Sequence, residues 1–311
     1  MMSPARRPGT AGRRTDAWLA RGPGRLALRG WRDDRLAVLA YHGVDDADAF
    51  DRHLSWLQGN ASVVSLEQLI DGMRGDRLPP RPVLLTFDDG HRSVLEQAQP
   101  RLAARGMPAV VFVVAGVVDS NDPFWWQEVE SLSARGGSVG QWPGRRGREL
   151  VRTLKALPDA DRRMALVELR ASVTGVRATH PQLSADDLRT LEAAGIAVGN
   201  HTMTHPNLNR CDDDVLVSEI ETAHHRLTDI LGHPPIAWAD PYGSHDRRAD
   251  AVLDRLGYEI GFLFDHRRVH LPLADPLAVS RVRVDSDTAL DRFVSIVTGV
   301  HPAIHHWRGR P

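Results

Sequence analysis

Residues 82–90 read Pro-Val-Leu-Leu-Thr-Phe-Asp-Asp-Gly, a mostly apolar run that ends in two adjacent carboxylates. The apolar part has the length and composition of a buried β-strand. Asp88 and Asp89 follow at its carboxyl end, where Gly90 allows the backbone to turn away sharply. Two neighbouring carboxylates repel each other, and a bound cation relieves that repulsion. The stretch therefore predicts a strand that delivers paired acids to a cation site, although an ordinary Asp-Gly turn has the same pattern.

Similar short apolar runs recur from residue 35 onward, and amphipathic segments separate them. The runs span residues 35–41, 82–87, 109–114, 195–199, 236–239, 258–264 and 278–284. The segments between them include Phe50, Leu54 and Leu57 at helical spacing, a capping box of Ser65 with Gln68, and an apolar stripe from Leu216 to Ile230. This alternation predicts an α/β fold with a parallel sheet, either open or closed into a barrel.

One long stretch breaks the alternation. Residues 119–183 contain Phe124-Trp125-Trp126, a loop rich in Gly and Arg near residues 135–148, and a helical pattern around residues 159–173. We interpret this stretch as a helical insertion between two strands that covers one end of the fold. The rest of the chain shows no sign of internal repeats or of a second domain.

The overall composition is that of an ordinary globular protein. The 311 residues include 39 Lys+Arg and 40 Asp+Glu, which gives a formal net charge of −1, and 42% of the residues are apolar. Such a balance argues against a nucleic-acid partner, since nucleic-acid-binding proteins carry a basic excess. The single cysteine, Cys211, cannot form an internal disulfide. The longest apolar run, residues 109–118, is about half as long as a membrane span, so no transmembrane segment is expected.

The N-terminal segment differs from the remainder of the chain. Residues 1–32 hold eight arginines and one acid. This composition predicts a disordered basic tail ahead of a catalytic domain at residues 33–311. Association of the tail with an anionic membrane surface is the alternative interpretation. Because no apolar segment follows the first arginines, we expect no signal peptide and a cytoplasmic location.

Three further polar segments each follow a predicted strand. The segment His201-Thr202-Met203-Thr204-His205 carries two histidines, which on one helical turn would point the same way and could share a metal. Residues 238–243 read Trp-Ala-Asp-Pro-Tyr-Gly, and Tyr41-His42-Gly43 follows the first strand. Taken singly, these segments also fit loop histidines, a Pro-Tyr-Gly turn and a hydrogen-bonded core histidine.

All four segments lie at the carboxyl end of a predicted strand, which favours a functional site over four unrelated turns. Barrels of α/β type gather their active sites at the carboxyl ends of their strands. Two histidines and one carboxylate leave coordination positions open, as catalytic metal sites do. The second carboxylate is then available as a base for a water that the metal activates. The constellation indicates metal-assisted hydrolysis.

These motifs resemble those of the polysaccharide deacetylase family, also described as the NodB-homology domain or carbohydrate esterase family 4. The resemblance rests on T-F-D-D-G at residues 86–90, H-T-x-x-H-P-x-L at residues 201–208 and P-Y-G at residues 241–243, and it covers residues from about 35 to 300. It implies a distorted (β/α) barrel with fewer than eight repeats. It also implies an enzyme, a metal-dependent hydrolase that removes acetyl groups from an N-acetylated sugar substrate.

The resemblance also implies roles for particular residues. Asp88 would be the general base, and Asp89, His201 and His205 would hold a divalent metal, with Zn²⁺ as the expected ion. The backbone N–H of Tyr242 would donate to the oxyanion. Trp125, Trp126 and Trp238 suit stacking on sugar rings, and they equally suit a place in the apolar core.

Two positions depart from the family pattern. The arginine that commonly stands two residues before the proline of P-Y-G is replaced by Ala239, and the C-terminal segment from Ile296 to His301 matches the family's catalytic histidine motif poorly. The identity of the general acid is therefore open, and after Arg281, which is considered next, His42 and His301 are the next candidates for the role of the missing arginine.

Arg281 is our candidate to replace the missing arginine. Strand alternation puts Arg281 and Arg283 on one face of the last predicted strand. If the barrel closes, that strand neighbours the first one, and Arg281 can reach Asp88 as a positioning residue of the catalytic site. The alternative is that both arginines pair with surface acids such as Asp285.

Two other functions fit the same motifs. The first is a hydrolase of the same fold that acts on a non-sugar amide or a cyclic imide. The second is a non-catalytic relative that binds a metal or a carbohydrate. Asp88 argues against pure binding, because a metal site needs no base beside its carboxylate ligand.

Overall fold

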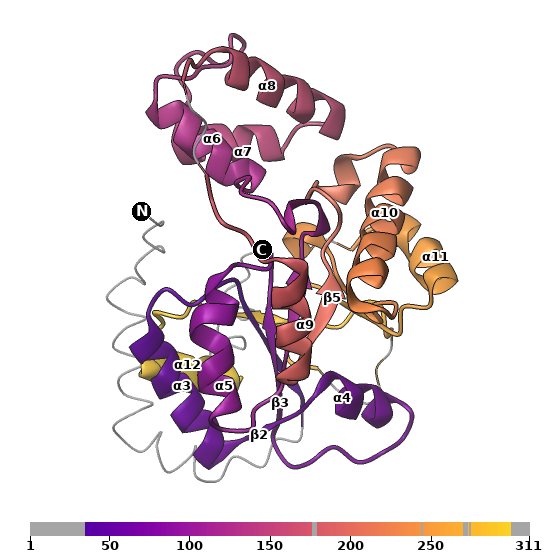
Figure 1. Cartoon of the computed structure of the whole chain (residues 1–311). Helices are drawn as coiled ribbons and strands as arrows, with labels where there is room; N and C mark the ends of the chain where they lie inside the picture. Colours follow the sequence, from indigo (N-terminus) through magenta and orange to yellow (C-terminus); the bar gives the residue numbers. More distant parts are fainter. Residues whose placement is uncertain (1–34, 176–178, 244, 270–272, 274, 300–311) are drawn as a thin grey trace.

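The computed structural model describes residues 35–175, 179–243, 245–269, 273 and 275–299 (Figure 1). The predicted basic tail and His301 lie outside these described residues. Within them, no helix combines the length and the apolar character needed to cross a membrane.

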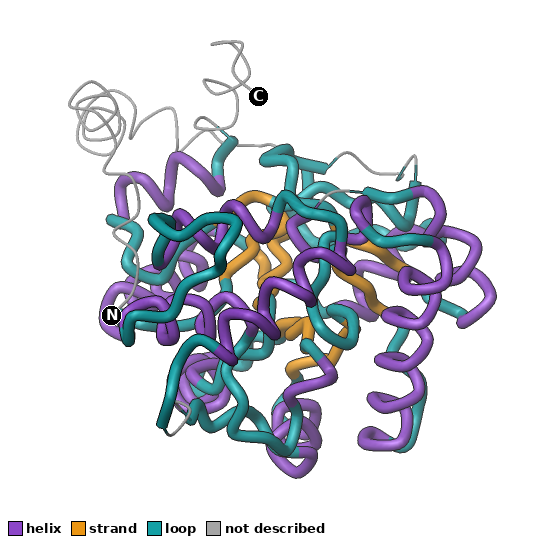
Figure 2. The backbone as a smooth tube through the Cα atoms, turned by 90° about the horizontal axis from the view of Figure 1, so that it is seen from above, coloured by secondary structure: helices purple, strands orange, loops and turns teal. Residues whose placement is uncertain are grey.

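A parallel sheet forms the centre of the molecule, with helices around it (Figure 2). Its strands run in the order β7-β6-β5-β4-β3-β1-β8, and β2 pairs with β3 outside this path. The strands are β1 (Ala37–Tyr41), β2 (Ser62–Val63), β3 (Pro82–Phe87), β4 (Ala109–Val113), β5 (Ile196–Asn200), β6 (Ala237–Ala239), β7 (Ile260–Phe262) and β8 (Val282–Arg283). Each predicted apolar run overlaps one of these strands, and β2 lies outside all of the predicted runs.

The segment around β8 joins the two edges of the sheet. Val282 pairs in parallel with Leu39 of β1, and Val279 forms a parallel bridge to Phe262 of β7. One short stretch of chain therefore contacts both the first and the last strand of the sheet. The parallel sheet curls into a distorted (β/α) barrel with fewer than eight repeats, and the predicted fold class is confirmed.

Alternate residues along the strands serve two apolar cores. Leu39 and Leu85 belong to the core between the sheet and the helices, whereas Val38, Phe112 and Phe262 belong to the core inside the barrel. The rings of Phe112 and Phe262 lie 5.4 Å apart and fill the barrel. Polar chemistry is thereby restricted to the end of the barrel where the strands terminate.

Helices and short helical turns connect the strands. The helices of the barrel are α3 (Ala47–Asn60), α4 (Leu66–Met73), α5 (Gln99–Ala103), α9 (Ala185–Ala193), α10 (Asp213–Leu231), α11 (Arg247–Leu256) and α12 (Leu290–Val297). The short turns are η1 (Val94–Ala98), η2 (Ala115–Val117), η3 (Leu208–Arg210) and η4 (Pro241–Gly243). The predicted capping box is present at α4, where Ser65 and Gln68 bond each other's backbone N–H.

Three helices form the insertion between β4 and α9. They are α6 (Trp125–Ala134), α7 (Gly147–Lys155) and α8 (Asp159–Ala171), and they lie together at one end of the molecule (Figure 1). They enclose an apolar cluster of their own, which includes Val129, Leu150 and Leu169. The predicted helical insertion at about residues 119–183 is confirmed.

Gly243 ends the P-Y-G turn where the turn lies closest to another segment. Its φ is +68°, and a Cβ atom there would lie 1.9 Å from the Cβ of Phe264. Gly257 has a similar φ of +80° but open space around it. We expect Gly243→Ala to lower the free energy of unfolding by at least about 1 kcal/mol more than Gly257→Ala, because only the first variant adds a clash to the backbone strain. Equal losses in urea unfolding would contradict this account.

Candidate active site

Asp88 and Asp89 lie at the carboxyl end of β3 and are almost completely buried. The backbone N–H of Asp88 donates to the carbonyl of Tyr41 at 2.8 Å, which extends the contact of β3 with β1. Asp89 has a φ of +71° and Gly90 a φ of +78°, so the chain turns away immediately after the pair. The two carboxylates can therefore face different partners although they are adjacent in sequence.

Asp89 faces the two histidines of the 201–205 segment. Its Oδ1 lies 3.5 Å from Nε2 of His201 and 3.4 Å from Nε2 of His205, and all three ligand atoms lie within 4.8 Å of one another. A tetrahedral metal with bonds of about 2.0–2.1 Å separates its ligand atoms by about 3.3 Å. The spacing of these three residues fits a divalent metal with positions left open.

Hydrogen bonding fixes the ring of His201. Its Nδ1 donates to the carbonyl of Ala239 at 2.7 Å. Since a carbonyl only accepts, this bond places a proton on Nδ1, and in the neutral ring the lone pair is then on Nε2, the nitrogen that faces Asp89. This is the tautomer that a metal ligand requires.

The prediction that both histidines lie on one helical turn is wrong. Residues 201–207 form a loop, in which Thr202 has a φ of +70° and His205 a φ of +56°. These left-handed conformations do not occur within a right-handed helix. Asn200 Oδ1 accepts from the N–H of Thr202, and Thr202 Oγ1 accepts from the N–H of His205. These polar side chains build the loop that turns both rings towards Asp89.

Asp88 faces Arg281, which comes from the segment that joins the edges of the barrel. The Nη1 and Nη2 atoms of Arg281 donate to the two carboxylate oxygens of Asp88 at 2.6 and 3.0 Å. The arginine is fully buried, and its Nε donates to the carbonyl of Leu263 at 2.9 Å. Arg283 instead has an exposed side chain that pairs with Asp285. The two arginines thus follow different predicted alternatives: one reaches Asp88 and the other pairs with a surface acid.

These surroundings keep both carboxylates ionised. Burial alone would raise the pKa of Asp88, but the charge of Arg281, together with His201 and His42, holds that pKa below its ordinary value. Burial likewise opposes ionisation of Asp89, but interactions with His201 and His91 hold its pKa well below the usual range. Burial lowers the pKa of His205 to about 3, so its ring is neutral and able to ligate a metal.

The remaining predicted residues lie at the same end of the barrel. His42 follows β1 and is partly buried; burial lowers its pKa, and the charges of Asp89 and Asp88 offset this effect only in part. The ring of Tyr242 stands edge-on to that of His205, with centroids 4.6 Å apart. Trp238 is fully buried in the protein core, so its suggested contact with a sugar ring is wrong.

Sequence reasoning missed one histidine at this site. Nε2 of His91 lies 3.4 Å from Oδ2 of Asp89, whereas His201 and His205 approach Oδ1 of the same carboxylate. His91 directly follows T-F-D-D-G in the sequence, and this position next to the motif could have identified it as a candidate site residue.

The insertion packs directly against the loop of residues 201–207, which we call the metal-ligand loop because His201 and His205 could hold a metal. Nε1 of Trp125 donates to the carbonyl of His205 at 3.2 Å, and the ring of Trp126 lies 4.7 Å from the ring of His205. The ring of Phe124 packs against His91 at 5.1 Å. The three aromatic residues at the start of the insertion therefore contact two of the three histidines beside Asp89.

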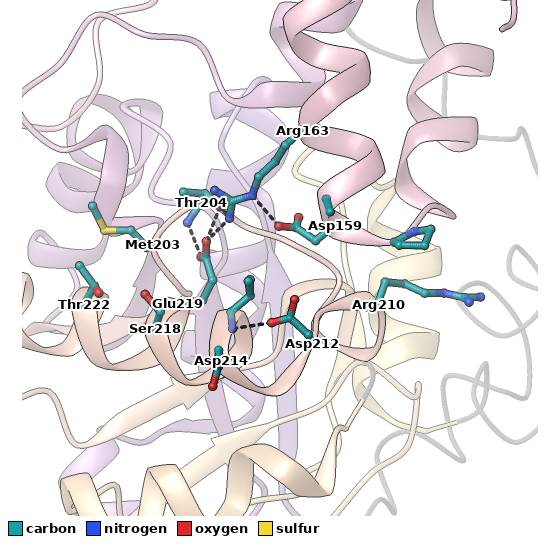
Figure 3. A pocket seen from close by; sticks show the side chains of 13 residues that line it. Asp159, Arg163, Met203, Thr204, Arg210, Asp212, Asp214, Ser218, Glu219 and Thr222 are labelled. Carbon is teal, nitrogen blue, oxygen red and sulfur yellow. Dashed lines mark hydrogen bonds and ion pairs between the residues drawn. The ribbon is translucent and has the colours of Figure 1, made fainter.

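A polar network on the outer side of the same loop also involves the insertion (Figure 3). Arg163 of α8 donates to Asp159 at 2.5 Å and to Glu219 of α10 at 2.8 Å. Glu219 in turn accepts from both the N–H and the hydroxyl of Thr204, at 2.7 and 2.6 Å. These residues line a cavity of about 630 Å³ beside the loop. Arg163 thus links the insertion to the residue that precedes His205.

Removal of Arg163 should loosen the metal-ligand loop without unfolding the protein. We expect Arg163→Met to weaken metal binding on the order of tenfold, because residues that support metal ligands tune affinity in this way. Arg210→Met is the matched control, since Arg210 is exposed and lines the same cavity. Competition with a chromophoric chelator measures the affinity, and circular dichroism monitors folding. Identical metal affinities for the two variants would contradict the role of Arg163.

Asp240 gives a pH-dependent prediction. It is almost fully buried, its Oδ1 has no hydrogen-bond partner among the described residues, and burial raises its pKa to about 7. The folded state therefore binds this proton more tightly than the unfolded state. The contribution of Asp240 to the free energy of unfolding is complete below about pH 4 and is lost as the pH rises to about 7. Asp240→Asn stays neutral. Relative to this variant, the wild type should lose up to about 4 kcal/mol of unfolding free energy over that range. Parallel pH profiles of the two proteins would contradict the assignment.

Comparison with known proteins links this geometry to one family. The family model described as polysaccharide deacetylase matches residues 75–142 and 168–261, just over half of the chain. The poly-beta-1,6-N-acetyl-D-glucosamine N-deacetylase of Escherichia coli strain K12 is 33% identical over 108 residues, which are 30% of this chain and 16% of that protein. The match thus spans a small part of that relative. The putative polysaccharide deacetylase YxkH of Bacillus subtilis is 24% identical over 114 residues, 34% of this chain and 41% of that protein.

Two solved structures share the fold over most of the chain. IcaB from Ammonifex degensii is 21% identical, with a TM-score of 0.59 over 86% of this chain and 97% of that chain. The deacetylase PplD of Streptococcus pyogenes is 17% identical, with a TM-score of 0.58 over 89% of this chain and 99% of that chain. At these identities the likeness shows a common barrel.

Proposed function

Because this chain belongs to the polysaccharide deacetylase family, we propose that it hydrolyses the N-acetyl group of an amino sugar in a glycan-type substrate and that it requires a divalent metal. The observation that carries the proposal is that the two adjacent carboxylates have different partners. Asp88 is held by an arginine, and Asp89 faces two histidines at ligand spacing. A base beside a metal site is the arrangement that hydrolysis of an amide uses. The name of the Escherichia coli relative supports an N-acetylated sugar as the substrate.

We assign Asp89, His201 and His205 as the metal ligands. Two imidazoles and one carboxylate at this spacing favour Zn²⁺, with at least one coordination position open. When bound, such an ion polarises an amide carbonyl and makes water more acidic.

Asp88 serves as the general base in this proposal. It takes a proton from the attacking water, and the bidentate contact with Arg281 holds its carboxylate in one orientation. The same contact keeps Asp88 ionised below its ordinary pKa. The low pKa makes Asp88 a weaker base, and a divalent metal, when bound, would offset that loss by making water easier to deprotonate.

The proposal also gives roles to Tyr242 and His42. The backbone N–H of Tyr242 donates to the oxygen on which negative charge develops. His42 donates a proton to the departing nitrogen, because an amine anion is a very poor leaving group. Its position supports this role, since it lies at the same barrel end, within the electrostatic influence of Asp88 and Asp89.

Acetate release from N-acetylated oligosaccharides tests the proposal. We expect activity that disappears with a chelator and returns with Zn²⁺. Asp88→Asn should keep the metal and lose activity by a factor of ~10²–10⁴, whereas Asp89→Asn should lose the metal. A panel that adds a non-sugar amide and a cyclic imide separates the alternative hydrolases. Hydrolysis of these compounds alone, or activity that persists without metal, would refute the proposal.

The contact of Arg281 with Asp88 gives a further prediction about turnover. Arg281→Met should reduce kcat strongly and leave the metal content unchanged, because Asp88 loses its orientation but the ligands do not. The single variant should also lose about 3–5 kcal/mol of stability, since it leaves a buried carboxylate unpaired. The double variant Arg281→Met with Asp88→Asn removes that charge and should regain stability without regaining activity. Wild-type turnover in a folded Arg281→Met protein would contradict the positioning role.

A further inference from the structure

Lys155 is the last residue of α7 and the only lysine in the chain. Two neighbours on its helix, Leu150 and Leu154, are buried in the apolar cluster of the insertion, and they anchor this end of α7. Lys155 itself is partly buried and extends towards the barrel instead of into the insertion. Its Nζ lies 3.5 Å from the centre of the Tyr242 ring, across the boundary between the two parts.

This contact places a positive charge beside the proposed catalytic centre. The Tyr242 ring lies edge-on against the ring of His205, so one aromatic ring separates the ammonium from a proposed metal ligand. The charges of Asp89 and Arg283 both act on Lys155, which places it at the same mouth of the barrel. Arg283 already has a carboxylate partner in Asp285.

Within the described part of the chain, Lys155 has no such partner. Among the described residues, no carboxylate lies within ion-pair distance of its ammonium group, although the chain pairs many of its arginines. An ammonium group has three donors, and the face of one aromatic ring satisfies only part of that capacity. Burial and Arg283 lower the pKa of Lys155, so both disfavour the charged form in the protein alone. A bound anion would relieve this cost.

We propose that Lys155 binds an anionic group of the substrate, either a carboxylate or a phosphate carried by the N-acetylated sugar. The inference rests on the proposed deacetylase function and adds a substrate class to it: acidic amino sugars are preferred over neutral ones. In this subsite the Tyr242 ring packs against the ammonium group, and Lys155 of the insertion provides the positive charge. Lys155 lies between the two stretches that match the family model, so the proposed subsite belongs to the insertion of this chain.

The single lysine allows a binding test that needs no turnover. Reductive methylation with ¹³C-formaldehyde labels Lys155 and the N-terminal amine only and keeps the positive charge, and Lys155→Arg identifies the lysine signal by its loss. The probes, at constant ionic strength, are N-acetylglucosamine 6-phosphate, N-acetylmuramic acid and neutral N-acetylglucosamine.

We expect the Lys155 signal to shift saturably with at least one acidic sugar and not with the neutral sugar. Comparison of the phosphate with the carboxylate then identifies the preferred anion. No shift with either acidic sugar, or an equal shift with the neutral sugar, would overturn the proposal. Because the readout is binding, it decides the question even if no acetate is released.

Kinetics on the same sugars gives an independent test. Lys155→Met should raise KM for the preferred acidic sugar on the order of tenfold to a hundredfold relative to the neutral sugar, with kcat little changed. Lys155→Arg should restore the preference, and Arg152→Met, at an exposed position on the same helix, is the control. An equal fall in kcat on both sugars would overturn the proposal in favour of a catalytic or structural role. Failure of the wild type to release acetate from any sugar would instead refute the proposed function.

Discussion

The buried pair of Arg281 and Asp88 is the interaction on which the site depends. A fully buried guanidinium is costly unless its donors are paired, and here they bond both oxygens of Asp88, the carbonyl of Leu263 and the hydroxyl of Thr86. Arg281 and these partners come from three different segments, which come together only when the barrel is complete. The orientation of the proposed base therefore depends on closure of the sheet, because Arg281 reaches Asp88 only from the segment that joins the two sheet edges.

The metal-ligand loop depends on a second kind of support. Thr202 and His205 adopt left-handed conformations, which cost free energy and persist only where their surroundings hold them. Asn200 and Thr202 hold the loop from within, and Trp125 and Arg163 hold it from the insertion. The insertion thus contacts the site in two places. Trp125 and Arg163 support the metal-ligand loop, and Lys155 lies against the ring of Tyr242.

The sequence predicted those features that local patterns determine. Strand positions follow from apolar runs, and the capping box at Ser65 follows from residues three apart. The same local reasoning failed for His201 and His205, because their spacing suits a helix, whereas the true loop is set by hydrogen bonds from Asn200. The contact of Arg281 with Asp88 could be considered only on the assumption that the barrel closes. The contact of Lys155 with Tyr242 could not be predicted from the sequence, because it joins segments far apart in the chain.

The adjacent carboxylates have different partners. Asp88 is hydrogen-bonded to Arg281, and we propose that Asp89 binds the metal. Anomalous diffraction at the zinc edge, from crystals grown with Zn²⁺, tests this claim most directly. We expect one strong peak bonded to Oδ1 of Asp89 and to Nε2 of both His201 and His205, with Asp88 still paired to Arg281. A peak that has Asp88 as a ligand, or a zinc site that excludes either histidine, would contradict it.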